Sequence, residues 1–252
     1  MNDSTKRFSD RVEDYVKYRP GYPSELADYL HSRWGLDSGA VVADVGAGTG
    51  ISSSLFLRRR HPVFAIEPNT EMREKAIELL GMQPLFSALN GTAESTGLDD
   101  ETIDLIVAGQ AFHWFDQVAT RKEFQRILKP GGVVALIWNE RLTEEGFAAD
   151  YDSFIIRHAT DYTKVDHRNI SPEEISQFFS PHICDYKAFP NSQTFDMQGL
   201  LGRLASSSYI PPRDTPEFKK MEADLYALFH QYQLDGIITI RYETKVFSGR
   251  LK

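Results

Sequence analysis

A glycine-rich run lies between a stretch typical of a buried strand and a stretch typical of a helix. Residues 40–45 are almost all apolar and residues 51–60 read as a helix, so Gly46, Gly48 and Gly50 fall in the turn between them. Glycines in such a turn let a ligand approach the backbone closely. Ligands of open α/β sheets also bind at the carboxyl ends of the strands, where this turn would lie. The run therefore predicts a ligand-binding site.

Two carboxylates accompany this run. Glu67 ends the next expected strand, and from there it can accept hydrogen bonds from both hydroxyls of a ribose. Asp44 stands two residues before the first glycine, where it would repel a pyrophosphate. The glycines follow G-x-G-x-G, and Ile51 occupies the place of the third glycine of a dinucleotide fingerprint. A nicotinamide-dependent dehydrogenase is therefore disfavoured, although it stays open as an alternative.

The surrounding sequence alternates between expected strands and helices. The strands are residues 40–45, 63–67, 84–89, 103–108 and 133–138, and the helices between them include residues 51–60, 71–80 and 118–128. Near-continuous apolar strands separated by helices predict a parallel sheet that is covered on both faces. Outside this part, residues 9–34 read as two helices broken at 19–23. Residues 140–180, 197–208 and 215–232 also look helical, and residues 237–251 are β-rich.

Five blocks of the sequence resemble, in order, the motifs of class I S-adenosylmethionine (SAM) dependent methyltransferases. They are residues 41–50, 66–69, 91–94 before Leu98, 103–106 with 110–115, and 128–132. These motifs are similar to those of the methyltransferase type 11 group, which includes enzymes that act on small molecules and are similar to trans-aconitate methyltransferase. The resemblance covers about residues 40–139 and is far more specific than the glycine run alone.

The resemblance implies a fold as well as a cofactor. We expect an α/β protein with a doubly wound, seven-stranded, mostly parallel sheet of the Rossmann-like methyltransferase type, in which residues 237–251 supply the antiparallel last strand. We expect residues 1–252 to form a single methyltransferase domain. Residues 1–35 would be an N-terminal helical cover over the active site, and residues 140–215 a mostly helical acceptor-side insertion.

The resemblance also assigns cofactor-binding roles by position. The methionine half of SAM would lie against the run that contains Asp44, Gly46, Ala47, Gly48, Thr49 and Gly50. Glu67 would hold the ribose, and the adenine would be bordered by Pro68, Ala93 and Glu94. Gln110 and Ala111 would lie close to the sulfonium, and Tyr15 and Arg19 would reach the SAM carboxylate from the N-terminal cover.

The acceptor side is less defined. By analogy with the group, the first expectation is a small-molecule acceptor that is methylated on a carboxylic acid oxygen. His113 is a candidate general base because its ordinary pKa lies near 6.5, but it can equally be a structural histidine beside Trp114. Trp114 and Phe115 are candidates for a wall of the acceptor site or for part of the core, and Tyr209 is a candidate acceptor contact. An RNA or protein methyltransferase and a non-catalytic SAM-binding regulator remain alternatives.

The composition limits the kinds of partner, metal site and compartment that we expect for this protein. The formal net charge is −8, from 36 acidic and 28 basic residues, which opposes a general nucleic-acid role. No apolar stretch approaches the ~20 residues of a membrane helix. The single cysteine, Cys184, excludes an internal disulfide and a cysteine-based zinc site, and it suits a cytoplasmic location. No carboxylate cluster for a catalytic metal is evident, so we expect no metal site.

Overall fold

The computed structural model describes residues 12–159 and 171–252, and its centre is a seven-stranded sheet. The strand order is β3-β2-β1-β4-β5-β7-β6. The first five strands pair in parallel, whereas β7 is antiparallel to β5 and β6 is antiparallel to β7. The strands are β1 Val42–Val45, β2 Val63–Ile66, β3 Phe86–Leu89, β4 Ile103–Gly109, β5 Leu128–Arg141, β6 Asp185–Phe195 and β7 Ile238–Arg250. The expected doubly wound, mostly parallel fold is therefore confirmed.

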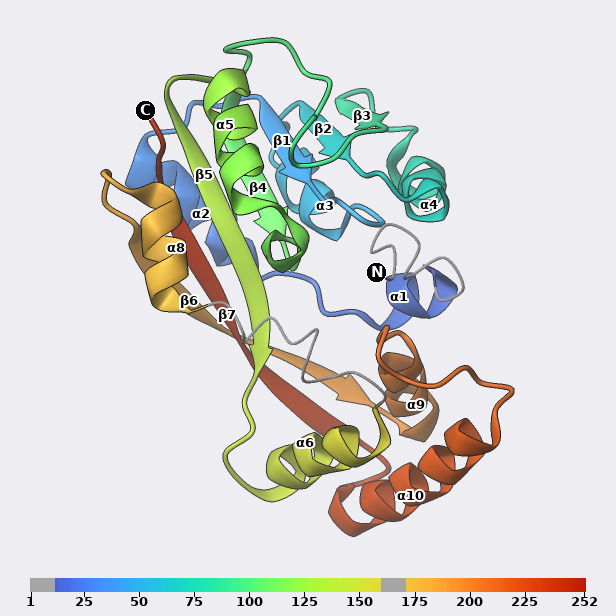
Figure 1. Cartoon of the computed structure of the whole chain (residues 1–252). Coiled ribbons are helices and arrows are strands. Elements are labelled where there is room, and N and C mark those ends of the chain that lie inside the picture. The colour runs from blue at the N-terminus through green and yellow to red at the C-terminus, as the bar shows by residue number, and fades with distance from the viewer. Residues whose placement is uncertain (1–11, 160–170) are drawn as a thin grey trace.

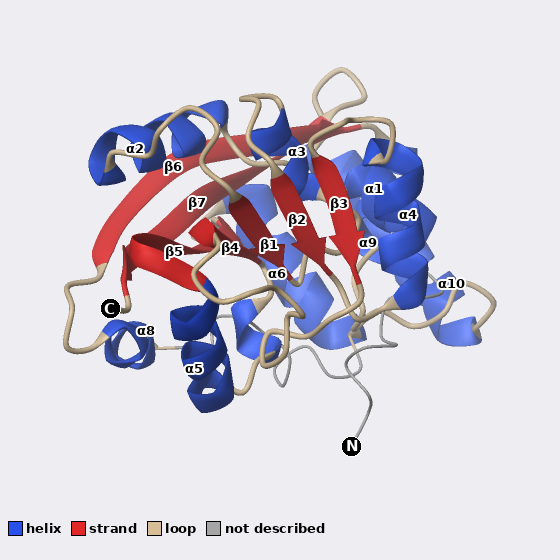
Figure 2. Cartoon of the chain, turned by 90° about the horizontal axis from the view of Figure 1, so that it is seen from above, coloured by secondary structure: helices blue, strands red, loops and turns tan. Residues whose placement is uncertain are grey.

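Helices cover both faces of this sheet (Figure 2). On one face, α2 (Ser24–Trp34) and α3 (Ile51–Leu57) bury Leu26, Leu30 and Phe56 against β1, β4 and β5. On the other face, α5 (Gln117–Ile127) and α8 (Pro172–Phe179) contribute to a second apolar core. The helix α4 (Thr70–Leu80) precedes the edge strand β3. Strands buried on both faces account for the near-continuous apolar runs in the sequence.

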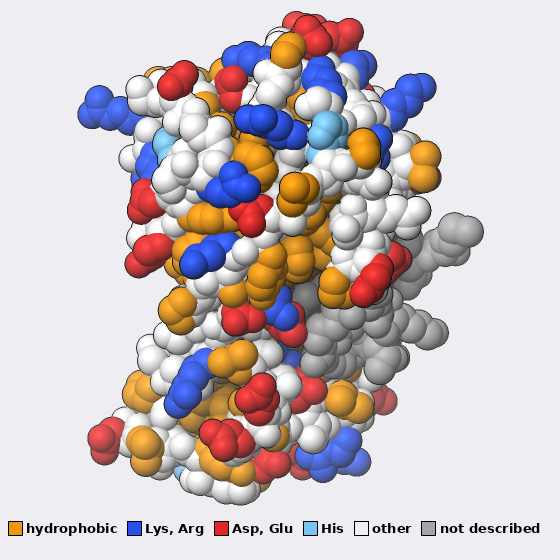
Figure 3. Space-filling model, turned by 90° about the vertical axis from the view of Figure 1, so that its left-hand side faces the viewer, with side chains coloured by type: hydrophobic (Ala, Val, Ile, Leu, Met, Phe, Trp, Pro, Cys, Tyr) orange, Lys and Arg blue, Asp and Glu red, His pale blue; other side chains and the backbone are white. Residues whose placement is uncertain are grey.

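A second lobe surrounds the far ends of the three longest strands (Figure 1). Its helices are α6 (Gly146–His158), α9 (Met197–Ala205) and α10 (Pro216–Tyr232), which share a separate apolar core with β6 and β7. In the side view of Figure 3, acidic and basic side chains are interspersed over both parts of the face. No helix within the described ranges is long and apolar enough to cross a membrane.

The sequence expectations failed at one strand. Residues 140–215 were expected to be mostly helical, but Asp185–Phe195 form β6, the edge strand beside β7. Most β6 side chains are partly or fully exposed, so the strand lacks a strong apolar signal. Pro190 also argues against a strand in the sequence, yet an edge strand tolerates proline because one side of it needs no partner. The helix expected from Ser171 is present and begins with a capping box.

The two N-terminal helices have different positions. The helix α2 belongs to the helical layer on the sheet, whereas α1 (Val12–Tyr18) buries none of its residues fully and lies between the two lobes (Figure 1). Tyr18 packs directly over Gly202 of α9, where a β-carbon would collide with its ring. Gln193 of β6 donates a hydrogen bond to the Tyr18 carbonyl at 3.2 Å. Of the expected cover, it is therefore α1 that bridges the lobes.

Two histidines contact each other away from the junction of the lobes. Nε2 of His31 lies 2.7 Å from Nε2 of His61, and Nδ1 of His61 is 2.9 Å from the Ala40 carbonyl oxygen. His61 is buried. Burial, and then the neighbouring His61, lower the pKa of His31 below its ordinary value of 6.5. This environment therefore favours the neutral form of the His31 imidazole.

We expect the folded protein to lose stability as the pH falls below about 6.5, because the unfolded His31 then takes up a proton that the folded one resists. Urea unfolding at pH 7.5 and pH 5.5 measures this loss. His31→Gln keeps a donor toward His61 but removes the titrating group, so its unfolding free energy should change less between the two pH values. An equal change in both proteins would contradict the assignment.

Candidate functional site

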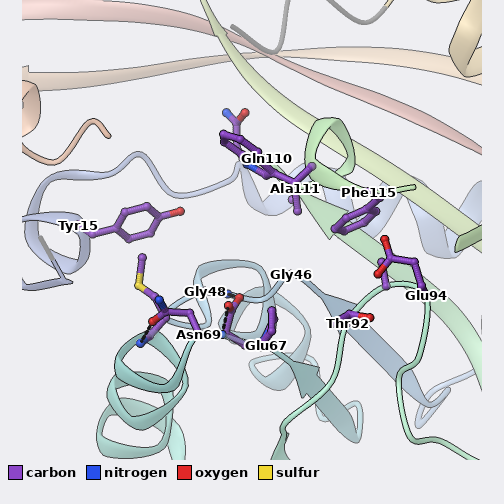
Figure 4. A pocket seen from close by; sticks show the side chains of 15 residues that line it. Tyr15, Gly46, Gly48, Glu67, Asn69, Thr92, Glu94, Gln110, Ala111 and Phe115 are labelled. Carbon is purple, nitrogen blue, oxygen red and sulfur yellow. Dashed lines mark hydrogen bonds between the residues drawn. The ribbon is translucent and has the colours of Figure 1, made fainter. Parts of the chain in front are cut away.

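An open hollow lies at the carboxyl ends of β1, β2 and β4 (Figure 4). Its walls come from α1, from the loops that follow these strands, and from the loop before β4. The lining residues are Tyr15, Gly46, Gly48, Glu67, Pro68, Asn69, Met72, Thr92, Ala93, Glu94, Gly109, Gln110, Ala111, Trp114 and Phe115.

The glycine run shapes the floor of this cavity. Gly46 and Gly48 have φ values of +70° and +56°, which L side chains rarely adopt. A β-carbon on Gly46 would lie 2.6 Å from the Ala111 β-carbon, so Gly46 permits the close contact between the loops after β1 and β4. A β-carbon on Gly48 would face Tyr15, with the hydroxyl oxygen 3.8 Å away. The missing side chain at Gly48 therefore leaves space beneath the Tyr15 ring.

Glu67 fixes the run from the side. Its Oε2 accepts a hydrogen bond from the Gly48 amide at 2.8 Å, and its Oε1 accepts one from the Asn69 amide at 2.9 Å. Burial raises the pKa of this carboxyl, and the hydrogen bonds from the two amides partly offset that increase. Each carboxylate oxygen keeps further lone pairs for a ligand. The arrangement can therefore accept hydrogen bonds from a pair of hydroxyl groups.

The opposite wall follows β4. Gln110 has a φ of +56°, which is unusual for a residue other than glycine, and its side-chain amide donates to the Asn139 carbonyl at 3.1 Å. Its backbone amide donates to the Ile137 carbonyl at 2.8 Å. Figure 4 shows Gln110 and Tyr15 across the cavity from Glu67. Backbone strain held in this way is common at ligand sites.

The cavity carries charge of one sign. Its charged lining residues are Glu67 and Glu94, and no lysine or arginine of the described chain lines it. Glu94 also accepts a hydrogen bond from the Asp116 amide at 2.9 Å. Two carboxylates favour a ligand with positive charge and oppose a pyrophosphate. This charge pattern suits a sulfonium cofactor better than a dinucleotide.

Comparisons with known proteins agree with this geometry. A family described as a methyltransferase domain matches residues 43–136. An uncharacterized methyltransferase of Mycobacterium tuberculosis is 36% identical over 208 residues, which are 82% of this chain and 79% of the relative. The chain belongs to the class I SAM-dependent methyltransferases. SAM is the cofactor of this enzyme.

Other relatives of the methyltransferase extend the likeness over most of its length. An uncharacterized methyltransferase-like protein of Schizosaccharomyces pombe is 28% identical over 257 residues, 97% of this chain and 95% of that protein. A solved structure, a putative type II methyltransferase from Anaeromyxobacter dehalogenans, shares the fold with a TM-score of 0.69. It is 21% identical and covers 93% of this chain, while the match spans 98% of that chain.

Most of the expected cofactor residues line the cavity of the methyltransferase. These are Tyr15, Gly46, Gly48, Glu67, Pro68, Ala93, Glu94, Gln110 and Ala111. Trp114 and Phe115, expected on the acceptor side, line it as well. Ala47, Thr49 and Gly50 do not line it but form the turn and the start of α3, where a β-carbon on Gly50 would lie 2.5 Å from Leu80 Cδ1.

Asp44 lies beneath the glycine run and does not line the cavity. It has no solvent exposure, and its carboxylate accepts hydrogen bonds from the Ser52 hydroxyl at 2.7 Å and the Ser53 hydroxyl at 2.6 Å. Burial raises the pKa of Asp44, and the serine hydrogen bonds oppose that rise. In this structure Asp44 secures the first turn of α3, through which it fixes the run above it.

Three further candidates also lie outside the lining. Arg19 donates from Nη2 to the Ser206 carbonyl at 2.9 Å, on the side of α9. His113 lies in the short 3₁₀ helix η2 (Phe112–Trp114), with its ring centroid 4.8 Å from that of Trp114. Tyr209 follows α9 and packs against the core of the second lobe.

Four lining residues received no role from the sequence. They are Asn69, Met72, Thr92 and Gly109. Asn69 and Gly109 stand where β2 and β4 end, a position that marks ligand loops in this fold. Asn69 is also the N-cap of α4, accepting from the Met72 amide at 2.8 Å. Met72 has no comparable signal, because a buried apolar residue on a helix also fits a core.

Proposed function

We propose that the enzyme transfers the methyl group of SAM to a small organic acid, with a carboxylate oxygen as the first candidate acceptor. The observation that carries the small-molecule part is the position of α1. Tyr15 of α1 lies over Gly48, so α1 covers part of the cavity. A concave, partly covered site suits a small acceptor better than an RNA or a protein.

The chain's own residues would position the reactants. In our proposal Glu67 holds the ribose hydroxyls, Pro68, Ala93 and Glu94 border the adenine, and Gly46 and Gly48 leave room for the methionine part. SAM supplies an activated methyl group on a positive sulfonium. Gln110, Ala111 and Tyr15 would limit the free volume beside that group and exclude water. Proximity and orientation then provide much of the acceleration, and a protein nucleophile is not required.

The same proposal assigns acceptor choice to the two variable segments, residues 1–35 and 140–215. Trp114 would form part of the acceptor wall, and Tyr209 would contact the acceptor from the second segment. His113 stays a candidate general base, which would act only in the arrangement that acceptor binding produces. The single cysteine fits a cytoplasmic location, which we include in the proposal.

Calorimetric titration with S-adenosylhomocysteine (SAH), compared with NADH, tests the cofactor assignment. We expect a dissociation constant on the order of micromolar for SAH and no measurable binding of NADH, because the cavity presents carboxylates to the ligand. NADH binding as tight as that of SAH would contradict the proposal. SAH release from SAM over a panel of small organic acids then tests turnover. Tight SAH binding without any methylated product would favour a SAM-binding regulator.

A further inference from the structure

Two arginine side chains meet at the junction of α1, α9 and the second lobe. Arg203 of α9 is buried, with Nη1 3.2 Å from the Ser207 hydroxyl and Nε 3.4 Å from the Tyr242 hydroxyl. Arg19 donates from Nη2 to the carbonyl oxygen of Ser206 at 2.9 Å. The Ser206 hydroxyl lies 3.5 Å from Nη1 of Arg203, so both guanidinium groups converge on one residue.

Neither arginine has an acidic partner within the described ranges. The nitrogen Nε of Arg19 is buried without a hydrogen-bond partner, and no carboxylate forms an ion pair with either guanidinium. Their polar neighbours are hydroxyl groups and a carbonyl. Other arginines in the same part of the molecule are paired: Arg141 with Asp152 at 2.6 Å and Arg213 with Asp14 at 2.7 Å. The missing counter-charge therefore distinguishes this buried pair from Arg141 and Arg213.

Uncompensated buried charge is costly, and Arg19 shows its effect. Burial, and then the positive charge of Arg203, lower the pKa of Arg19. Burial also opposes the charge of Arg203, but the surrounding tyrosine side chains outweigh it and raise the pKa of Arg203. The groups that face the pair from the packed elements are Tyr15, Tyr151, Tyr209 and Tyr242, and no carboxylate is among them. A buried cation without a partner is strongly disfavoured unless a ligand supplies the anion. The pair therefore has the properties of an anion-binding subsite.

This subsite adjoins the cofactor cavity but is separate from it. Neither arginine lines the cavity. The guanidinium carbon of Arg19 lies 5.0 Å from the centre of the Tyr15 ring, and Tyr15 itself lines the cavity opposite Gly48. Tyr15 thus has contacts on both sides, with the methyl-donor cavity and with the arginine pair. Only the Tyr15 side chain would separate an acceptor bound at the pair from the cofactor.

We propose that Arg19 and Arg203 bind an acidic group of the methyl acceptor, a carboxylate or a phosphate, that is distinct from the atom receiving the methyl group. This inference rests on the proposed function. Guanidinium groups bind such oxyanions through two parallel hydrogen bonds. Oxygen lone pairs engaged in that way are poor nucleophiles, so the methylated atom belongs to a second group on the same molecule. The acceptor is then a bifunctional acid rather than a simple monocarboxylate.

Titration of SAH-saturated protein with simple anions tests the subsite. The probes are malonate, succinate, glutarate, adipate and inorganic phosphate, with the uncharged dimethyl esters of the dicarboxylates for comparison, at constant ionic strength. We expect at least one anion to bind about tenfold more tightly than the esters. Arg203→Gln should weaken that binding about tenfold while the SAH affinity changes by less than about threefold. Arg203→Lys keeps the positive charge but lacks the planar guanidinium that makes two parallel hydrogen bonds, so it should give an intermediate loss of anion affinity.

Arg213→Gln is the matched control, because this arginine is exposed and already paired with Asp14. It should bind the anions as the unaltered protein does. The inference is overturned if no anion binds in a way that Arg203→Gln removes. It is also overturned if Arg19→Gln and Arg203→Gln, while folded by circular dichroism, each weaken SAH about tenfold, because the pair then serves the cofactor carboxylate. Failure of the unaltered protein to bind SAH would instead refute the proposed function.

Discussion

Replacement of Gly48 by valine should weaken SAH binding by at least about 100-fold, equivalent to about 2.7 kcal/mol, while the protein stays folded. Gly48 has a φ of +56°, and its β-carbon position points toward Tyr15 across the cavity. A β-branched side chain there occupies ligand space and disfavours the native backbone conformation. The altered loop would also misplace the Gly48 amide, which donates a hydrogen bond to Oε2 of Glu67 at 2.8 Å.

The control for this variant separates backbone strain from loss of ligand space. Gly236→Val introduces the same side chain at a φ of +77°, in a turn before β7 where nothing lies within 4 Å of the new β-carbon. We expect a loss of stability of about 1–2 kcal/mol without loss of SAH affinity. Calorimetry with SAH and circular dichroism measure both variants. SAH affinity retained by a folded Gly48→Val protein would refute the position of the site.

The parts of the site that could be predicted depend on local chain chemistry. The turn from Gly46 to Gly50 requires positive φ at three places, and glycine is the residue that meets this requirement without strain. Glu67 was recognisable because it ends an apolar strand, and parallel strands present their carboxyl ends at one edge of the sheet. Four of the five parallel strands are apolar runs between helical segments and so give clear signals, whereas residues 84–89, which contain β3, give a weaker one.

The parts that could not be predicted depend on contacts between distant residues. Arg19 and Ser206 are 187 positions apart, so nothing in the local sequence indicates that Arg19 turns toward α9. The position of Asp44 in the motif predicts contact with the ligand, but its carboxylate instead accepts hydrogen bonds from the hydroxyls of Ser52 and Ser53. The edge strand β6 was missed because its exposed side chains and Pro190 give no apolar alternation. In each case, contacts formed in the folded protein determined the result, and the local sequence does not show them.

A buried carboxylate holds the loop that borders the cavity on its adenine side. Glu123 of α5 accepts from the Thr96 amide at 2.8 Å and the Thr96 hydroxyl at 2.6 Å, and Arg126 donates to it at 2.7 Å. Burial alone would raise the pKa of Glu123, but the hydrogen bonds from Arg126 and Thr96 outweigh it and lower the pKa to about 2. The carboxylate therefore stabilises the folded state, and Ala93 and Glu94 lie in the loop it secures.

Glu123→Gln should lower the free energy of unfolding by about 2–3 kcal/mol at pH 7, because the amide cannot accept all of these hydrogen bonds. The ordinary pKa of 4.5 applies to the unfolded chain, so the advantage of the carboxylate is complete above pH 4.5 and is lost as the pH falls toward about 2. Urea unfolding at pH 7 and pH 3.5 should therefore show the two proteins converging at the lower pH. Asp100→Asn removes the exposed partner of the same Arg126 and should cost less than about 1 kcal/mol. A difference between Glu123→Gln and the unaltered protein that is independent of pH would mean that packing, and not the charge of Glu123, secures the loop.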